Sequence, residues 1–156
     1  MNSILKLNLQ DEITVNELWS LQHKAYRLEA ELIGFQEIPP LMETREMLSR
    51  SGETFFGCFD EDEELMGAIA VEEESPGQLT ITRMMVSPDY FRRGIASLLL
   101  SYVFEHYASM KLYIVSTGKL NMPAVSLYKK HGFLPTLTEE VAPGVELIEF
   151  HRSGSL

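Results

Sequence analysis

Cysteine and positive charge are scarce in this sequence, and long apolar runs are missing. Cys58 is the single cysteine among 156 residues, which excludes an internal disulfide and a cysteine-cluster metal site. Because Cys58 lies in the apolar, strand-like segment 54–59, we expect a buried and unreactive thiol. The four histidines are scattered without metal-ligand spacing, and we predict no metal.

The absence of other features narrows the class of protein further. No apolar run approaches the ~20 residues that a membrane-spanning helix needs. Residues 1–6 lack the apolar stretch and cleavage site of a secretory signal, so we expect a cytoplasmic protein with no membrane partner. The formal net charge is −10 at pH 7, whereas a nucleic-acid-binding protein needs a basic face. We therefore predict no nucleic-acid partner, and the acidic balance is compatible with cationic partners such as amines.

What the sequence does contain is an ordered series of strand and helix patterns, with a length that fits one domain over residues 1–156. A capping box at Thr14 and Glu17 predicts the start of the first helix, and Gly34 predicts its end. The expected elements are strand 4–9, helix 14–34, short helix 44–50, strands 54–59, 65–71 and 79–86, helix 94–108, strand 112–115, helix 121–130, and hairpin strands 134–141 and 145–151. A meander followed by helical crossovers predicts an α/β fold with a mixed sheet and helices on both faces.

The segment that carries chemistry is VSPDYFRRGIA, residues 86–96. A strand ends at its first residue, and a helix begins near Gly94. Unpaired N–H groups at a helix start carry partial positive charge and suit a pyrophosphate. The small residues Gly94 and Ala96 keep the approach open, and Arg92 and Arg93 can add charge-assisted contacts. The alternative is an ordinary strand-to-helix turn with two solvated arginines.

This segment resembles the acetyl-CoA signature of the GNAT superfamily of N-acetyltransferases, V-x-P-x-x-[RQ]-x-x-G-x-[GA]. The fixed positions of the signature are occupied by Val86, Pro88, Gly94 and Ala96. Phe91 departs from it, because the family usually has Arg or Gln at that position. The departure bears on the affinity for the cofactor more than on its identity, since a backbone cradle does not need that side chain.

A second segment, 121–133, is similar to the family pattern N-x-x-A-x-x-L-Y-x-K-x-G-F. The matching residues are Asn121, Ala124, Leu127, Tyr128, Lys130, Gly132 and Phe133. Both segments occur in the family's order and spacing. The resemblance implies a GNAT-type acyl-CoA N-acyltransferase fold, with a mixed, mostly antiparallel sheet of about seven strands and helices on both faces. It also implies acetyl-CoA as the cosubstrate.

The resemblance further implies which residues bind and react. The implied cofactor-binding residues are Met84, Met85, Val86, Arg92, Arg93, Gly94, Ile95, Ala96, Asn121 and Tyr128. The backbone of the strand ending at Val86 would pair with the pantetheine arm like an added strand, and amides near Met85 would stabilise the oxyanion. Asn121 would bind the pantetheine, cap its helix, or do both.

Tyr128 is the implied general acid, because the family places a tyrosine beside the cofactor sulfur. A phenol with a pKa of ~10 can protonate a thiolate whose thiol pKa is ~8.5. The alternative is a tyrosine buried in the core. The general base is less well marked: Glu72, at the end of a strand, is the candidate that we name. Glu29, Glu31 and Glu37 lie in the region that covers the acceptor pocket in the family, and each alone is typical of a solvated surface carboxylate.

The implied reaction is direct attack of a primary amine on acetyl-CoA in a ternary complex. The acceptor would be a small amine, a polyamine or a peptide amine. A second class stays open: a GNAT-fold acyl-CoA-binding sensor or interaction module without turnover, which Phe91 favours and Tyr128 disfavours. A phosphate-loop nucleotide-binding protein is disfavoured, because the segment lacks G-x-x-x-x-G-K-[ST]. Homodimers are common in the family, and the sequence does not decide between a homodimer and a monomer.

Overall fold

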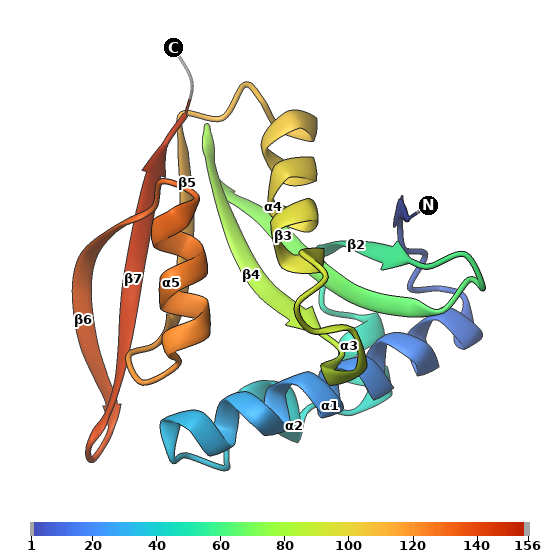
Figure 1. Cartoon of the computed structure of the whole chain (residues 1–156), viewed down its shortest axis with the longest axis horizontal. Helices are drawn as coiled ribbons and strands as arrows, with labels where there is room; N and C mark the ends of the chain where they lie inside the picture. Colours follow the sequence, from blue (N-terminus) through green and yellow to red (C-terminus); the bar gives the residue numbers. More distant parts are fainter. Residues whose placement is uncertain (1, 155–156) are drawn as a thin grey trace.

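A computed structural model of the chain describes residues 2–154. The strands form one seven-stranded sheet in the order β1-β2-β3-β4-β5-β7-β6 (Figure 1). The strands are β1 (Ser3–Lys6), β2 (Thr54–Phe59), β3 (Leu65–Ser75), β4 (Gln78–Val86), β5 (Leu112–Gly118), β6 (Leu134–Ala142) and β7 (Val145–Ser153). The helices are α1 (Glu12–Ile33), α2 (Pro39–Met42), α3 (Arg45–Ser49), α4 (Ile95–His106) and α5 (Met122–Lys130). The predicted mixed, mostly antiparallel sheet is confirmed, because only the β4–β5 pair is parallel among these strands.

Helix α1 begins earlier than the sequence pattern predicts. Its N-cap is Asp11, whose carboxylate accepts from the Thr14 N–H at 3.2 Å and from the Thr14 hydroxyl at 2.7 Å. The prediction that Thr14 and Glu17 form the cap was therefore wrong, because a better acceptor stands one turn upstream. Gly34 ends the helix with φ +71°, as expected for a left-handed cap.

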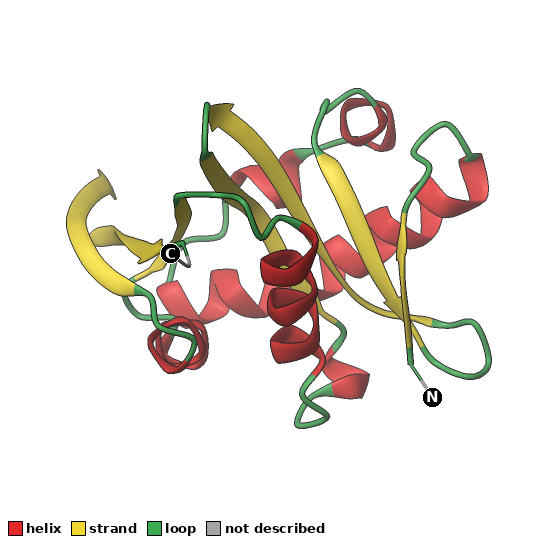
Figure 2. Ribbon diagram, turned by 90° about the horizontal axis from the view of Figure 1, so that it is seen from above, coloured by secondary structure: helices red, strands yellow, loops and turns green. Residues whose placement is uncertain are grey.

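Helices cover both faces of the sheet, because the central strands are apolar on both sides (Figure 2). Phe55 and Phe56 are neighbours in β2, and each is buried on an opposite face of the sheet. Phe56 packs in the core formed with α4, and Phe55 packs in the core formed with α1. Burying one such side chain contributes about 1.5–3 kcal/mol, so each helix is held by several contributions of that size.

The feature that positions the site is the divergence of β4 from β5. The two strands pair only from Gln78–Ile81 to Leu112–Val115. Beyond that point β4 continues to pair with β3, and β5 continues to pair with β7. The sheet therefore opens as a V, with the C-terminal half of α1 lying across its open end (Figure 1).

Candidate functional site

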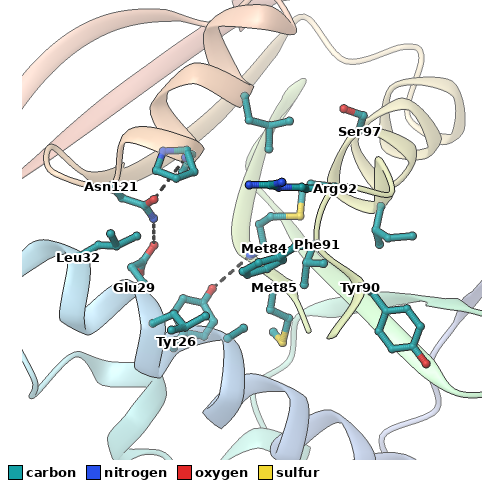
Figure 3. A pocket seen from close by; sticks show the side chains of 18 of the residues that line it. Tyr26, Glu29, Leu32, Met84, Met85, Tyr90, Phe91, Arg92, Ser97 and Asn121 are labelled. Carbon is teal, nitrogen blue, oxygen red and sulfur yellow. Dashed lines mark hydrogen bonds between the residues drawn. The ribbon is translucent and has the colours of Figure 1, made fainter. Parts of the chain in front are cut away.

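A pocket of about 730 Å³ occupies the region where β4 and β5 diverge (Figure 3). Its walls come from α1, the end of β4, the loop into α4, the first turn of α4, and α5. The lining residues are Ala25, Tyr26, Leu28, Glu29, Glu31, Leu32, Met84, Met85, Val86, Tyr90, Phe91, Arg92, Gly94, Ile95, Ala96, Ser97, Asn121, Pro123, Ala124 and Leu127. The volume lies within the range of pockets that take small molecules and cofactors.

The inner edge of β4 presents backbone groups to this pocket. The Ser87 N–H donates to a β3 carbonyl at 2.8 Å, and bonding to a neighbouring antiparallel strand alternates along the chain. Met85 is therefore bonded to β3, whereas Met84 and Val86 direct their backbone groups to the open side. The Met84 N–H confirms this direction, because it donates to the Tyr26 hydroxyl at 3.2 Å (Figure 3). An extended ligand can pair with this edge, and the amide on offer belongs to Met84 rather than to Met85.

The start of α4 forms another wall of the pocket. Gly94 is its N-cap with φ +72°, a left-handed conformation that glycine adopts without strain, and a Cβ there would meet no atom within 4 Å. Arg92 lines the pocket and extends across it (Figure 3). Arg93 lies outside the lining, with its guanidinium 5.1 Å from the centre of the Tyr90 ring. The structure thus brings one of the two arginines to the pocket.

Asn121 and Glu29 meet where α1 crosses the start of α5. The Asn121 side-chain oxygen accepts from the Ala124 N–H at 3.3 Å, which caps α5. Its amide group donates to Glu29 Oε1 at 2.7 Å (Figure 3). The Thr117 hydroxyl donates to the same oxygen at 3.4 Å. Burial raises the pKa of Glu29 above its ordinary value, and the two hydrogen bonds offset only part of that rise. The expectation of a solvated carboxylate at Glu29 was wrong.

A signal for Glu29 was present in the sequence. Tyr26, Glu29, Ala30 and Ile33 follow the spacing i, i+3, i+4, i+7 of one helix face, and the three apolar members are buried. Leu28 and Leu32, which lie on a neighbouring face of the helix, border the open pocket instead.

Tyr128 is buried, with 3% of its surface exposed, and its ring packs edge-on against Phe133. Its hydroxyl makes no hydrogen bond within residues 2–154, yet no fully enclosed polar side-chain atom of these residues lacks a partner. The hydroxyl must therefore retain some access to open space. Burial, followed by the charges of Tyr26 and Glu29, raises the Tyr128 pKa well above its ordinary value of 10. The phenol is therefore protonated at neutral pH, and Tyr128 lies outside the set of residues that line the pocket.

Comparison with known proteins identifies the family of this chain. The model of the Acetyltransferase (GNAT) family matches residues 15–133, which include both sequence motifs and all the walls of the pocket. The chain belongs to this family. The resemblance stated from the two motifs is therefore confirmed.

Individual relatives of this GNAT protein differ in how far they extend. UPF0157 protein YqkA from Bacillus subtilis (strain 168) is 37% identical over 145 residues, which cover 93% of this chain and 42% of that protein. The chain thus spans less than half the length of that relative.

Two solved structures show the GNAT fold along the whole chain. The ribosomal-protein-S18-alanine N-acetyltransferase from Escherichia coli has a TM-score of 0.79 at 15% identity, covering 100% of this chain and 96% of that one. The PaiA N-acetyltransferase from Thermoplasma acidophilum, in complex with coenzyme A, has a TM-score of 0.74 at 18% identity, covering 98% and 99% of the two chains. At such identities the likeness establishes the fold alone.

The remaining predicted residues of the GNAT site lie in different places. Glu72 is exposed on β3, opposite Thr80, outside the pocket lining. Glu31 is exposed and lines the pocket, whereas Glu37 is exposed and does not. Phe91 lines the pocket and is half exposed. The structure brings together Met84, Val86, the start of α4, Asn121 and one arginine, and it leaves Glu72 apart.

Two further features concern metals and membranes. Within residues 2–154, no group of three or more His, Cys, Asp or Glu side chains is arranged to hold a metal ion, and Cys58 is buried in β2. None of the helices described here combines the length and the apolarity that crossing a membrane requires.

Proposed function

We propose that this GNAT protein transfers an acetyl group from acetyl-CoA to a primary amine by direct attack in a ternary complex. The observation that carries the proposal is the β5 side of β4 beyond Ile81, an edge that pairs with no described strand and whose Met84 N–H faces a pocket that also contains the start of α4. This arrangement fits the two ends of the cosubstrate: the Met84–Val86 edge suits the amide groups of a pantetheine arm. The N–H groups that follow Gly94, together with Arg92, suit its pyrophosphate.

The protein's own groups have distinct tasks in this reaction. When bound, acetyl-CoA supplies a thioester whose carbonyl carbon is the electrophile. The Met84 N–H, which donates to the Tyr26 hydroxyl at 3.2 Å, would bind and polarise the carbonyl oxygen once that oxygen takes the place of the hydroxyl. Tyr128 would protonate the departing thiolate, because its hydroxyl is protonated at neutral pH and retains some access to open space.

Calorimetric titration of the purified protein with acetyl-CoA tests the first half of the proposal, with NADH and ATP as controls. Selective, saturable binding of acetyl-CoA is expected. Failure of the folded protein to bind acetyl-CoA would contradict the proposal.

Release of the coenzyme A thiol in the presence of amines tests the second half. The acceptor panel contains a small alkylamine, a polyamine and an alanyl peptide; the peptide is included because the Escherichia coli neighbour is named for an alanine of ribosomal protein S18. Amine-dependent thiol release supports the transferase. Tight acetyl-CoA binding without release on any amine would instead favour the sensor or interaction module.

A further inference from the structure

We infer that Glu29 binds the ammonium group of the acceptor and takes its first proton, so that the acceptor is a cationic primary amine. This inference rests on the proposed function and deepens it, because it names the charge of the substrate and the carboxylate that receives it. It also replaces Glu72 as the residue of interest, since Glu72 lies outside the pocket.

The position of Glu29 supports the inference. Its carboxylate lies in the pocket on the α1 side, one helical turn from Tyr26, whose hydroxyl contacts the Met84 N–H (Figure 3). Both hydrogen bonds to the carboxylate end on Oε1, one from Asn121 and one from Thr117. Within residues 2–154, no hydrogen bond or ion pair ends on Oε2. One oxygen is thus held by the protein, and the other is available to a ligand.

The charges around the partly buried carboxylates of the protein support the inference independently. The partly buried carboxylates of Glu43 and Glu53 both form ion pairs with Arg83, so each has a cation beside it. Glu29 has no cation beside it among the described residues, although it also is removed from solvent. An uncompensated, partly buried carboxylate is costly to a fold and is typical of a site where a ligand supplies the opposite charge.

The other titratable groups around the pocket leave this role open. Those that line it are Tyr26 and Glu31 from α1 and Tyr90 and Arg92 from the loop before α4. Tyr128 of α5 is not a lining residue, but it lies near enough for Tyr26 and Glu29 to raise its pKa. Tyr26 and Tyr128 are buried phenols with raised pKa values and stay neutral. Arg92 comes from the loop on the α4 side, where it suits the anionic cosubstrate. Glu31 is exposed at the rim.

The ammonium loses one proton to Glu29 Oε2, and the freed nitrogen lone pair forms a C–N bond with the thioester carbonyl carbon. The nitrogen of the adduct loses a second proton, which returns to Tyr128 after the phenol has protonated the departing thiolate and the C–S bond has broken. Glu29 releases its proton to solvent. The products are the amide, the free thiol and one proton.

The experiment uses four protein samples: the wild type, Glu29→Gln, Glu29→Asp and the matched control Glu31→Gln. Glutamine keeps an oxygen for Asn121 but carries no charge, so a merely structural role for Glu29 would survive the change. Calorimetry with coenzyme A is performed first, and all four samples are expected to bind it. Loss of coenzyme A binding in the wild type would overturn the proposed function, and this inference with it.

The charge preference is then measured on the coenzyme A complex with n-pentylamine and its uncharged analogue n-pentanol as probes. We expect the wild type and Glu31→Gln to prefer the ammonium at least about tenfold, Glu29→Gln to lose that preference, and Glu29→Asp to regain part of it. An unchanged preference in Glu29→Gln would overturn the inference while leaving the proposed function standing.

The pH dependence of turnover with the fastest amine of the panel gives a second readout. Because burial raises the Glu29 pKa above 4.5, the wild-type rate should rise with pH through that raised pKa as the carboxylate ionises. Glu29→Gln should lower kcat/KM by roughly 10²–10⁴-fold and abolish this limb of the profile. A profile of the same shape in both proteins would contradict the assignment.

Discussion

Arg83 and Glu29 are both charges withdrawn from water, and the protein treats them in opposite ways. Arg83 donates to Glu43, Glu53 and the Gln22 side chain, so its charge and its donors are compensated. Glu29 receives two hydrogen bonds and no cation. At the scale of single residues, one charge thus holds elements of the fold together, whereas the other leaves a carboxylate oxygen available to the ligand that we propose.

Replacing Glu29 by glutamine should stabilise the folded protein at neutral pH. The pKa of Glu29 is higher in the folded than in the unfolded protein, so the folded protein loses stability as the pH rises from the unfolded pKa to the folded pKa. Above the folded pKa the whole of this loss is present. We expect Glu29→Gln to have the higher Tm at pH 7.5, by roughly 2–4 °C for each kcal/mol relieved. Near pH 4 the difference should vanish. A lower Tm at pH 7.5 would show that the ionised carboxylate is structurally required.

Removing the Tyr128 hydroxyl should impair turnover without impairing binding. Tyr128→Phe keeps the ring in its packing against Phe133 and removes only the proton donor. We expect turnover to fall by roughly 10²–10⁴-fold, with the calorimetric Kd for acetyl-CoA nearly unchanged. Tyr113→Phe serves as the control, because Tyr113 is equally buried and its hydroxyl donates to the Tyr107 carbonyl outside the pocket. Equal losses in the two variants would argue for a packing role.

At the scale of elements, short-range patterns predicted the series of helices and strands well. Gly34 and Thr44 act at the expected ends of helices, because a left-handed glycine and a capping hydroxyl act on neighbouring residues. Long-range features were not predictable in this way. The divergence of β4 from β5 depends on α1 crossing the open end, and the Arg83 network joins residues up to 61 positions apart. The removal of Glu29 from solvent was missed for the same reason, since its partner Asn121 is 92 positions away.

The contacts of Arg83 with Gln22, Glu43 and Glu53 should contribute strongly to holding α1, the α2–α3 segment and β4 together. The Arg83 side chain is 11% exposed, and removing it leaves two carboxylates unpaired. We expect Arg83→Ala to lower the free energy of unfolding by about 3–5 kcal/mol in urea denaturation. Arg50→Ala breaks an exposed pair with Glu46 and should cost less than about 1 kcal/mol. Similar losses of unfolding free energy in the two variants would contradict this structural role of Arg83.

The placement of α4 should depend on the absence of a side chain at Gly67. A Cβ there would lie 2.9 Å from Ile95 Cγ2 and 2.9 Å from the Met85 carbonyl oxygen, so the first turn of α4 would have to shift. We expect Gly67→Ala to cost about 1–3 kcal/mol of stability and to weaken acetyl-CoA binding. Gly144→Ala is the comparison: its Cβ would meet nothing within 4 Å, but its φ of +74° makes the substitution costly to stability, and Gly144 does not line the pocket, so acetyl-CoA binding should be kept. Undiminished binding in Gly67→Ala would contradict the expectation.

At the scale of the whole molecule, the sheet consists of two parts that share a short parallel pairing. The strands β1–β4 form one part and β5–β7 the other, and four residue pairs connect β4 to β5. A ligand seated between the diverging strands contacts both parts at once. Binding of the cosubstrate should therefore make the two parts unfold together.

Acetyl-CoA should raise the melting temperature of the whole protein. A ligand at about 100 times its Kd stabilises the native state by about 2.7 kcal/mol, which corresponds to roughly 5–11 °C for a chain of this size. Differential scanning calorimetry should show a single transition that moves upward with ligand concentration. Two transitions of which only one responds would indicate that the parts melt separately.

The Met84 amide also gives the molecule a native spectroscopic label. Its proton now points at a phenol oxygen, and a carbonyl oxygen in the same place is a stronger acceptor. The ¹⁵N–¹H resonance of this one amide should then move to lower field when a thioester arrives, in a spectrum where most amides of the sheet stay still. Binding of the thioester can therefore be followed without a dye, because the amide that now donates to Tyr26 lies at the proposed reacting centre.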